Sequence, residues 1–154
     1  MNPAVTVSPL TREMIPAVAE IERLCFAEPW SEHALELYLG NGAFAMAALA
    51  ESGTAVGYGG ILLAPDEGQI LNLAVRPEAR RQGAGSAILS ALLDEARKRE
   101  LESVSLEVRV SNQAAIALYK RFGFAVAGTR KRFYRRPAED ALVMVCKLPA
   151  ALNT

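Results

Sequence analysis

Residues 69–96 read QILNLAVRPEARRQGAGSAILSALLDEA and decide the fold. The first seven are mostly apolar and predict a β-strand. A loop with two closely spaced glycines, Gly83 and Gly85, follows. Beyond it, apolar side chains recur every three or four residues, which predicts a helix with one buried face made by Ile88, Leu89, Leu92, Leu93 and Ala96. A crossover helix of this kind creates a parallel neighbour for the strand before it.

The segments before this unit predict two helices and three strands. Pro29-Trp30-Ser31 interrupts the helical pattern, and Ser31 is a candidate N-cap for a second helix that runs to about Leu39. Strands are expected at residues 5–7, 44–50 and 55–63, with turn residues between the later ones, which is typical of an antiparallel meander. The first helix has apolar residues at helical spacing, namely Met14, Val18, Ile21 and Cys25.

The segments after the central helix predict a strand at residues 103–108, a helix at 113–121 with Ser111 as its cap, and final strands at 124–133 and 141–148. The expected order is β-α-α-β-β-β-α-β-α-β-β. No repeat or linker divides the sequence, so residues 1–154 predict one domain. We therefore expect an α+β fold with a mixed, mostly antiparallel central sheet flanked by helices.

The composition excludes several classes of function. Seventeen basic and seventeen acidic residues give a formal net charge of zero, so direct nucleic-acid binding and membrane association are not expected. The longest purely apolar run, residues 43–50, is too short to span a bilayer, and the N-terminus lacks a signal-peptide pattern. Cys25, Cys146 and His33 cannot complete a zinc site without carboxylates, so no metal is expected. A cytoplasmic protein is the expectation.

The glycine loop is a candidate phosphate site. Its glycines let the backbone approach a ligand, and the N–H groups that open a helix favour an anion. Arg80 and Arg81 can add positive charge. The Walker A pattern is excluded because no Gly-Lys-Ser/Thr is present, and the dinucleotide fingerprint fits less well because Ile88 occupies the place of its third glycine. The alternative to a phosphate site is that the glycines only make the start of the helix flexible and that both arginines are solvated.

Several motifs together resemble the GNAT acetyltransferases. Arg80-x-x-Gly83-x-Gly85 matches the Arg/Gln-x-x-Gly-x-Gly/Ala signature by which that family binds acetyl-coenzyme A, and LNLAVRP at residues 71–77 resembles its cofactor-side strand. LEVRVSNQAAIALY at 106–119 and RFGF at 121–124 resemble the RimI branch, as do PWS at 29–31 and the aromatic pair Phe133-Tyr134. The similarity extends over residues 20–148 and implies a GNAT-like fold.

The resemblance implies a role for each matching position. Glu107 would be the base that deprotonates the attacking amine, and Tyr119 the acid that protonates the leaving thiolate. Acetyl-coenzyme A would be the co-substrate, without a metal. The positions implied to bind it are Leu73, Ala74, Val75, Arg80, Arg81, Gln82, Gly83, Ala84, Gly85, Ser86 and Asn112.

Each catalytic role has a plainer alternative when the residues are taken alone. A glutamate at a strand edge is commonly solvated or paired, here with Arg109 or Lys120 as candidates. A tyrosine near the end of a helix commonly packs with its ring half-buried and its hydroxyl in water. The linked set of motifs favours the catalytic interpretation of Glu107 and Tyr119.

The acceptor is less well defined than the co-substrate. The resemblance implies a protein or peptide N-terminus, most specifically the N-terminal alanine of ribosomal small-subunit protein eighteen, with Trp30, Phe133 and Tyr134 lining its site. The sequence departs from the RimI pattern where Arg135 and Arg136 precede Pro137, because that branch usually has a proline directly after the two aromatics. Transfer to a lysine side chain or small amine, and a non-catalytic acyl-coenzyme A-binding domain, are the alternatives.

Overall fold

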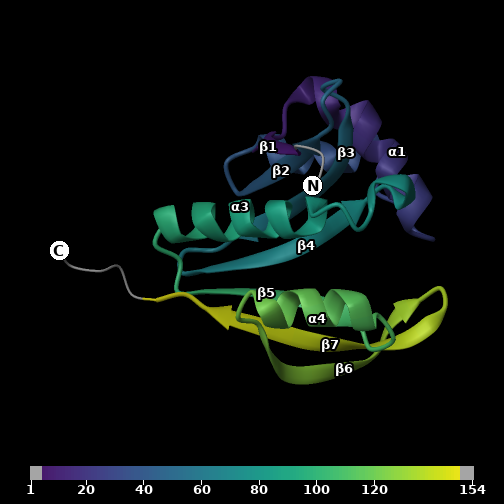
Figure 1. The fold of residues 1–154 in the computed structure, drawn as a ribbon. Coiled ribbons are helices and arrows are strands. Elements are labelled where there is room, and N and C mark those ends of the chain that lie inside the picture. Colours follow the sequence, from purple (N-terminus) through teal and green to yellow (C-terminus); the bar gives the residue numbers. More distant parts are fainter. Residues whose placement is uncertain (1–4, 150–154) are drawn as a thin grey trace.

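The structure is a computed structural model and describes residues 5–149. Its seven strands form one mixed sheet in the order β1-β2-β3-β4-β5-β7-β6 (Figure 1). β4 and β5 are parallel, whereas the other neighbours are antiparallel. The predicted α+β order and its parallel pair are therefore confirmed. The strands are β1 (Thr6–Pro9), β2 (Ala43–Leu49), β3 (Ala55–Leu63), β4 (Glu67–Val75), β5 (Ser103–Arg109), β6 (Ala125–Arg135) and β7 (Ala138–Lys147).

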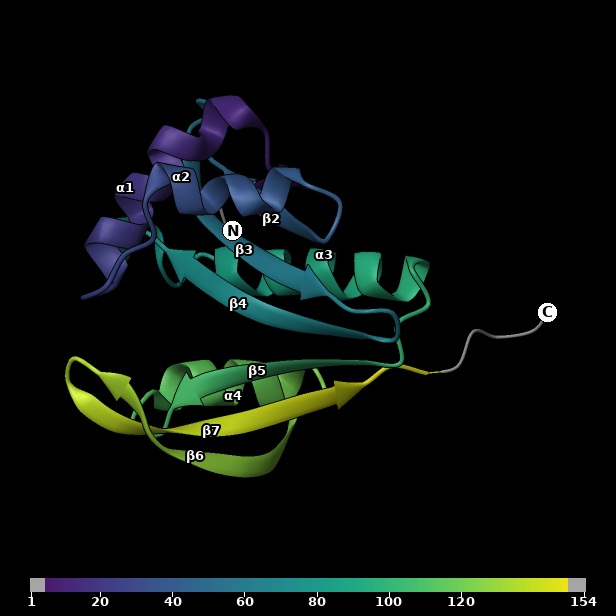
Figure 2. The ribbon, with the colours of Figure 1, turned by 180° about the vertical axis from the view of Figure 1, so that it is seen from behind.

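Helices cover the two faces of the sheet unequally. α3 and α4 lie on one face, and α1 and α2 lie on the other face beside β3, leaving β5, β7 and β6 uncovered there (Figures 1 and 2). In the described part of the chain, none of the helices is long and apolar enough to cross a membrane. The α-helices are α1 (Ile15–Cys25), α2 (Glu32–Leu35), α3 (Ala84–Lys98) and α4 (Gln113–Arg121), and the 3-10 helices are η1 (Arg12–Met14), η2 (Glu36–Leu39) and η3 (Pro77–Ala79).

Apolar periodicity correctly located the core. The α3 face packs on the sheet with all its predicted members fully or almost fully buried: Ile88, Leu89, Leu92, Leu93 and Ala96. In α1, Val18 and Ile21 are fully buried, whereas Met14 and Cys25 are partly exposed at the two ends of the helix. Removing this much apolar surface from water is the main favourable contribution to folding.

The N-cap of α2 is confirmed, and the helix then tightens. The Ser31 hydroxyl oxygen accepts a hydrogen bond from the Ala34 N–H at 3.1 Å, so it satisfies one of the free donors of the first turn. The α-helical geometry continues only to Leu35, and the 3-10 helix η2 completes the predicted segment to Leu39. Short 3-10 turns are frequent at helix ends.

The predicted N-cap of α4 is wrong by one residue. The cap is Asn112, whose side-chain oxygen accepts a hydrogen bond from the Ala115 N–H at 3.1 Å. Ser111 precedes the cap, and its N–H donates to Glu139 of β7 at 2.7 Å. Serine and asparagine are about equally good caps, so local chemistry does not distinguish Ser111 from Asn112.

The parallel pair β4–β5 is hydrogen-bonded along only part of its length. Pairing joins Glu67 through Ile70 to Ser103 through Leu106 and ends there. Beyond Ile70 and Leu106 the two strands diverge towards their carboxyl ends (Figure 2). The backbone of residues 71–75 and 107–109 is therefore separated at the centre of the sheet, where a ligand can enter between two strands.

Candidate active site

A cleft of about 420 Å³ lies where β4 and β5 separate. Residues 70–73 of β4 and 106–109 of β5 form its sides, and residues 133–136 of the β6–β7 hairpin form part of its rim. The segment between α1 and α2 contributes residues 26–28 and Trp30, while α4 contributes Tyr119. Glu22 and Asn112 complete the lining. Ligand sites of α/β sheets form at such carboxyl ends of diverging strands.

Glu107 lies in this cleft with both carboxylate oxygens engaged. Gln69 Nε2 donates to Oε1 at 2.8 Å, and Arg130 Nη1 lies 3.2 Å from Oε2. The side chain of Glu107 is only 12% exposed, whereas that of Arg130 is 61% exposed. Gln69 and Arg130 thus take the place of Arg109 and Lys120, the partners that the sequence suggested for this carboxylate. Together they hold the Glu107 carboxylate in one orientation within the cleft lining.

Tyr119 projects from α4 into the same cleft. Its ring is packed against Phe124 at a centroid distance of 5.7 Å, and the residue is 7% exposed. Burial, followed by the proximity of Tyr134, raises the pKa of Tyr119 to about 12. The ring of Tyr119 is therefore buried, not half-buried. The hydroxyl stays protonated at physiological pH and remains a donor inside the cleft.

An irregularity in β6 places the two adjacent aromatics at the cleft rim. Arg130 pairs with Ala141 and Tyr134 with Glu139, so three residues of β6 oppose one of β7. The Arg132 backbone is left-handed, at φ 53°, and its N–H donates to Asp140. Such bulges redirect side chains. Here Phe133 and Tyr134 both line the cleft and meet edge to face at 5.0 Å.

Arg109 holds the residues of the β6–β7 hairpin that form the cleft rim. Its guanidinium donates to the carbonyl oxygens of Arg136 and Pro137, both at 2.9 Å, and lies 4.2 Å from the centre of the Tyr134 ring. It also pairs with Glu139 at 3.1 Å. Hydrogen bonds from the Ser111 region, followed by the pairing with Arg109, hold the pKa of Glu139 below its usual range. The Arg109–Glu139 pair therefore stays charged and keeps residues 134–137 over the cleft.

The predicted co-substrate residues lie partly inside and partly outside the cleft. Leu73 and Asn112 line it, whereas the described lining does not include residues 80–86. Gly83 caps α3 in the left-handed conformation, at φ 84°, which favours glycine. A Cβ at Gly85 would lie no closer than 3.6 Å to its nearest neighbour, Leu118, so the fold itself does not require this glycine. The absence of a side chain at Gly85 thus leaves room for a ligand to approach the backbone closely.

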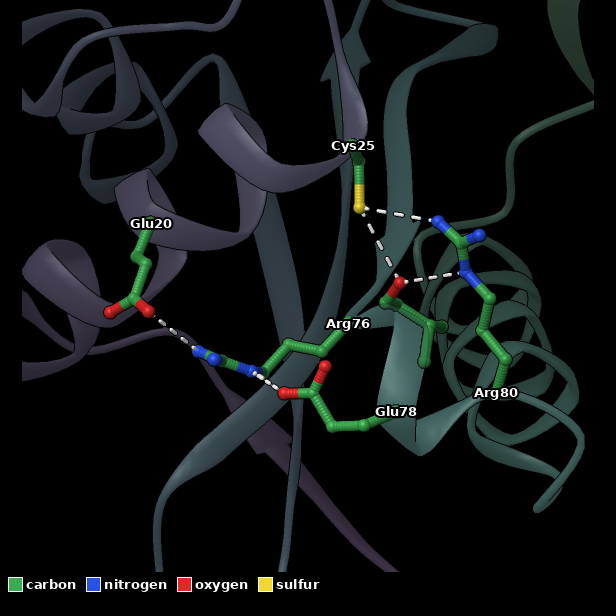
Figure 3. A network of polar contacts seen from close by, with 6 residues as sticks. Glu20, Cys25, Arg76, Glu78 and Arg80 are labelled. Atoms are coloured by element: carbon green, nitrogen blue, oxygen red, sulfur yellow. Dashed lines mark hydrogen bonds and ion pairs between the residues drawn. The ribbon is translucent and has the colours of Figure 1, made fainter.

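Two arginines of the segment between β4 and α3, Arg76 and Arg80, contact α1 and the end of β4 (Figure 3). Arg76 pairs with Glu20 of α1 at 3.2 Å and with Glu78 at 2.5 Å. Arg80 Nε donates to the Val75 carbonyl oxygen at 3.1 Å, and its Nη2 lies 3.5 Å from Cys25 Sγ. The Arg80 guanidinium is thus directed back to the strand rather than across the loop. Arg81 is exposed, with a left-handed φ of 64°.

Sequence reasoning missed three polar residues of the site: Glu22, Gln69 and Asn72. Gln69 orients Glu107, and Glu22 and Asn72 lie buried at the base of the cleft. One signal for Glu22 was present. It falls four residues after Val18 and seven after Ile15, within the apolar stripe of α1, where a carboxylate needs a buried partner. Within residues 5–149 there is no group of three or more potential metal-ligating His, Cys, Asp or Glu side chains.

We expect the protein to lose stability as the pH rises above about 10. Burial is the leading cause that raises the pKa of Tyr38, Tyr58 and Tyr119. A tyrosine in the unfolded chain titrates near pH 10, so the unfolded chain there releases protons that the folded protein keeps. The resulting stabilisation is complete below about pH 10 and is lost as the pH rises towards the folded pKa values. Thermal unfolding followed from about pH 8 to about pH 11 checks this, and a Tm that holds steady to about pH 11 would contradict it.

The fold and cleft define a class of protein. A parallel strand pair that parts around a cleft and is connected by a helix that begins after a left-handed glycine is the arrangement expected for acetyltransferases that use acetyl-coenzyme A. The model of the acetyltransferase (GNAT) family matches residues 15–124, so the chain belongs to this family. It is an acetyl-coenzyme A-dependent N-acetyltransferase close to the RimI enzymes.

The similarity to individual relatives covers nearly the whole chain. The [ribosomal protein bS18]-alanine N-acetyltransferase of Escherichia coli is 38% identical over 141 residues, covering 90% of this chain and 95% of that protein. N-alpha-acetyltransferase RimI of Mycobacterium tuberculosis is 36% identical over 146 residues, covering 91% of this chain and 90% of that protein. The crystal structure of the Escherichia coli ribosomal-protein-S18-alanine N-acetyltransferase matches with a TM-score of 0.89 at 35% identity, over 98% of each chain.

Proposed function

We propose that this enzyme transfers the acetyl group of acetyl-coenzyme A to the α-amino group of a protein N-terminus, with the N-terminal alanine of ribosomal protein bS18 as the leading acceptor. One observation carries the proposal: Glu107 of β5 and Tyr119 of α4 line the same cleft between the diverging strands. The acceptor is supported by the relatives, two of which carry names that state ribosomal or N-terminal acetylation.

Glu107 accepts the proton that the amine must lose. An α-amino group has a pKa of about 8 and is mostly protonated at neutral pH, so a base assists its attack on the thioester carbonyl. Gln69 and Arg130 hold the Glu107 carboxylate in one orientation. The amine forms its bond to the acetyl carbon as Glu107, directly or through a water, takes the proton.

Tyr119 then protonates the sulfur of the leaving group. The carbon–sulfur bond breaks with its electron pair on sulfur, and the Tyr119 hydroxyl donates a proton to it. Its raised pKa, about 12, keeps this hydroxyl protonated until that step. The new amide and coenzyme A are released, so neither a covalent enzyme intermediate nor an oxidant is needed.

The chain also offers a fitting place for the coenzyme. Gly83 opens α3 in a conformation that directs N–H groups outwards, and Gly85 leaves room for a close backbone approach. These groups, with Arg81, Gln82, Ala84 and Ser86, would hold the pyrophosphate. Arg80 would act mainly by stabilising the loop through Val75. Residues 73–75 and Asn112 would hold the pantetheine arm. Bound there, the coenzyme supplies the activated acetyl group.

The acceptor enters beside the aromatic side chains. Trp30 lines one side of the cleft, and Phe133 and Tyr134 line the opposite rim. An α-amine suits this chemistry better than a lysine, because its neutral fraction near pH 7 is higher by about two orders of magnitude. We therefore expect Trp30, Phe133 and Tyr134 to contact the first residues of a protein N-terminus.

We expect acetylation of a bS18 N-terminal peptide that begins with alanine, at a kcat/KM at least about tenfold above that for the same peptide with a blocked N-terminus and a free lysine. Mass spectrometry locates the acetyl group. Turnover on lysine or small amines alone would overturn the acceptor assignment. Coenzyme A binding without turnover on any amine would overturn catalysis and favour a regulatory domain.

A further inference from the structure

A buried carboxylate at the base of the cleft has no part in the proton transfers above. Glu22 lies near the end of α1 and is 1% exposed. Its Oε1 accepts the Trp30 N–H at 2.9 Å, and its Oε2 accepts the Tyr58 hydroxyl at 2.5 Å and the Asn72 Nδ2 at 3.4 Å. Burying a charge is costly unless hydrogen bonds compensate it. The donors around Glu22 therefore indicate what the carboxylate does.

These donors come from three separate parts of the chain. Trp30 belongs to the segment between α1 and α2 that walls the cleft, Tyr58 lies in β3, and Asn72 lies in β4 next to cleft-lining Leu71 and Leu73. Glu22 thus connects the backbone of the cleft wall to the strand that we assign to the coenzyme. A shift of α1 or of the wall would break at least one of these hydrogen bonds.

The same network also holds the Trp30 side chain. The Tyr38 hydroxyl donates to Asn72 Oδ1, and the Trp30 ring stacks on the Tyr38 ring at 5.7 Å with only 7° between the planes. Burial, followed by the Glu22 charge, raises the pKa of both Tyr38 and Tyr58, so both phenols stay neutral donors. Glu22 fixes the Trp30 backbone, while Tyr38 and Asn72 fix its ring.

The fold makes specific room for this arrangement. Tyr38 lies directly over Gly60 of β3, where a Cβ atom would come within 2.1 Å of the tyrosine ring. The ring also meets Tyr58 edge to face at 6.5 Å. A residue larger than glycine at position 60 would displace Tyr38, and with it the surface on which Trp30 rests.

The burial of Glu22 argues for positioning rather than proton transfer. Donors from the protein engage both oxygens of Glu22, as they do in Glu107, but Glu22 is only 1% exposed. A base for the amine needs an oxygen that the amine or a water can reach, which Glu107 offers at 12% exposure. Glu22 also lines the cleft, but its hydrogen bonds hold the wall of the cleft in place.

We propose that Glu22 is a positioning residue for the acceptor: it seats Trp30 and the adjoining residues 26–29 against β4, so that the cleft wall is preformed before the peptide binds. The proposal rests on the use of this cleft for the acceptor, as proposed above. A preformed wall lowers the ordering cost of binding. Its loss should therefore raise the KM for the peptide while kcat and the KM for acetyl-coenzyme A change little.

Kinetics of Glu22→Ala and Glu22→Gln test the proposal. We expect Glu22→Ala to raise the peptide KM about tenfold, with kcat and the acetyl-coenzyme A KM within about twofold. Glu22→Gln should restore the KM to within about threefold, because its carbonyl can still accept from Trp30 and its amide can donate to a reoriented Asn72. Arg23→Ala, an exposed neighbour on the same helix, is the matched control and should match the wild type.

Fluorescence gives a second readout that needs no turnover. Trp30 is the only tryptophan of the chain, so intrinsic emission reports on it alone. In Glu22→Ala we expect red-shifted emission and greater quenching by acrylamide, and in Glu22→Gln near wild-type values. If Glu22→Ala does not fold, Glu22→Asp replaces it. It keeps the charge but withdraws the carboxylate by one methylene, so it cannot span Trp30 and Tyr58 together, and both readouts should shift in the same direction.

Either of two results would overturn the proposal. Unchanged quenching and unchanged peptide KM in Glu22→Ala or Glu22→Asp would show that Glu22 does not hold the wall. Loss of kcat by more than about a hundredfold in Glu22→Gln, with KM unchanged, would make Glu22 a proton acceptor instead. A wild type that acetylates no N-terminal peptide would refute the proposed acceptor, whereas the fluorescence of the variants would still decide the role of Glu22.

Discussion

The Glu107→Gln variant is expected to acetylate an N-terminal peptide with kcat lowered by about two to three orders of magnitude, the usual contribution of a positioned general base. Glutamine keeps the size of the side chain and can still accept from Gln69, but it cannot take a proton from the amine. The cleft should keep its shape, so the KM values for both substrates should change by no more than about threefold. Steady-state kinetics with varied peptide and varied acetyl-coenzyme A measure these quantities.

The matched control for this variant is Glu102→Gln. Glu102 is exposed directly before β5, and it forms backbone hydrogen bonds with Asp66 and Leu148 that the substitution keeps, so the amide should leave kcat unchanged. Tyr119→Phe provides the companion measurement and should also lower kcat, because the phenyl ring keeps the packing on Phe124 but has no proton for the sulfur. A Glu107→Gln enzyme with at least about half the wild-type kcat would remove Glu107 from the proposed mechanism.

The Gly60→Ala variant is expected to lower the free energy of unfolding by about 3 kcal/mol, the upper part of the range for overpacking a core. The added methyl group would lie 2.1 to 2.5 Å from three atoms of the Tyr38 side chain, two ring carbons and the hydroxyl oxygen, so the side chain must move. That movement separates the hydroxyl from Asn72 and the ring from Trp30. For a chain of this length, the Tm should fall by about 6 to 12 °C, which calorimetry or circular dichroism measures.

Gly42→Ala is the control for the effect of a methyl group alone. No heavy atom lies within 4 Å of a Cβ built at Gly42, and its φ is not left-handed. The change should therefore alter the unfolding free energy by less than about 0.5 kcal/mol. Equal Tm values for the Gly60→Ala and Gly42→Ala proteins would show that Tyr38 moves away without cost, which the packing against Tyr58 and Trp30 argues against.

Much of the fold was predictable because its signals are local. The apolar period of α3, the Ser31 cap and the alternation of turn residues with apolar runs act over a few residues, and each was confirmed. The prediction failed at α4, where Ser111 and Asn112 were equivalent by local chemistry. The backbone path at the start of α4, where the Ser111 N–H donates to Glu139, 28 residues away in the chain, could not be predicted from that chemistry.

The candidate site was predictable only in part. Motif similarity selected Glu107, Tyr119 and the glycine loop, and the fold brings Glu107 and Tyr119 to one cleft. Motif similarity did not indicate that Gln69 and Arg130 hold Glu107, or that Arg80 turns back to Val75. These contacts depend on which side chains face each other across strands, and register sets that over long separations in sequence.

The sequence by itself determined the order of the strands and helices, the apolar faces and the family, because periodicity, caps and motifs are properties of neighbouring residues. The tertiary structure alone decided the cleft, which exists because β4 and β5 stop pairing after Ile70 and Leu106. It also decided the hydrogen-bond partners of Glu22, which lie 8, 36 and 50 residues away in the chain. A carboxylate is solvated or buried according to what packs around it, and that packing exists only once the chain has folded.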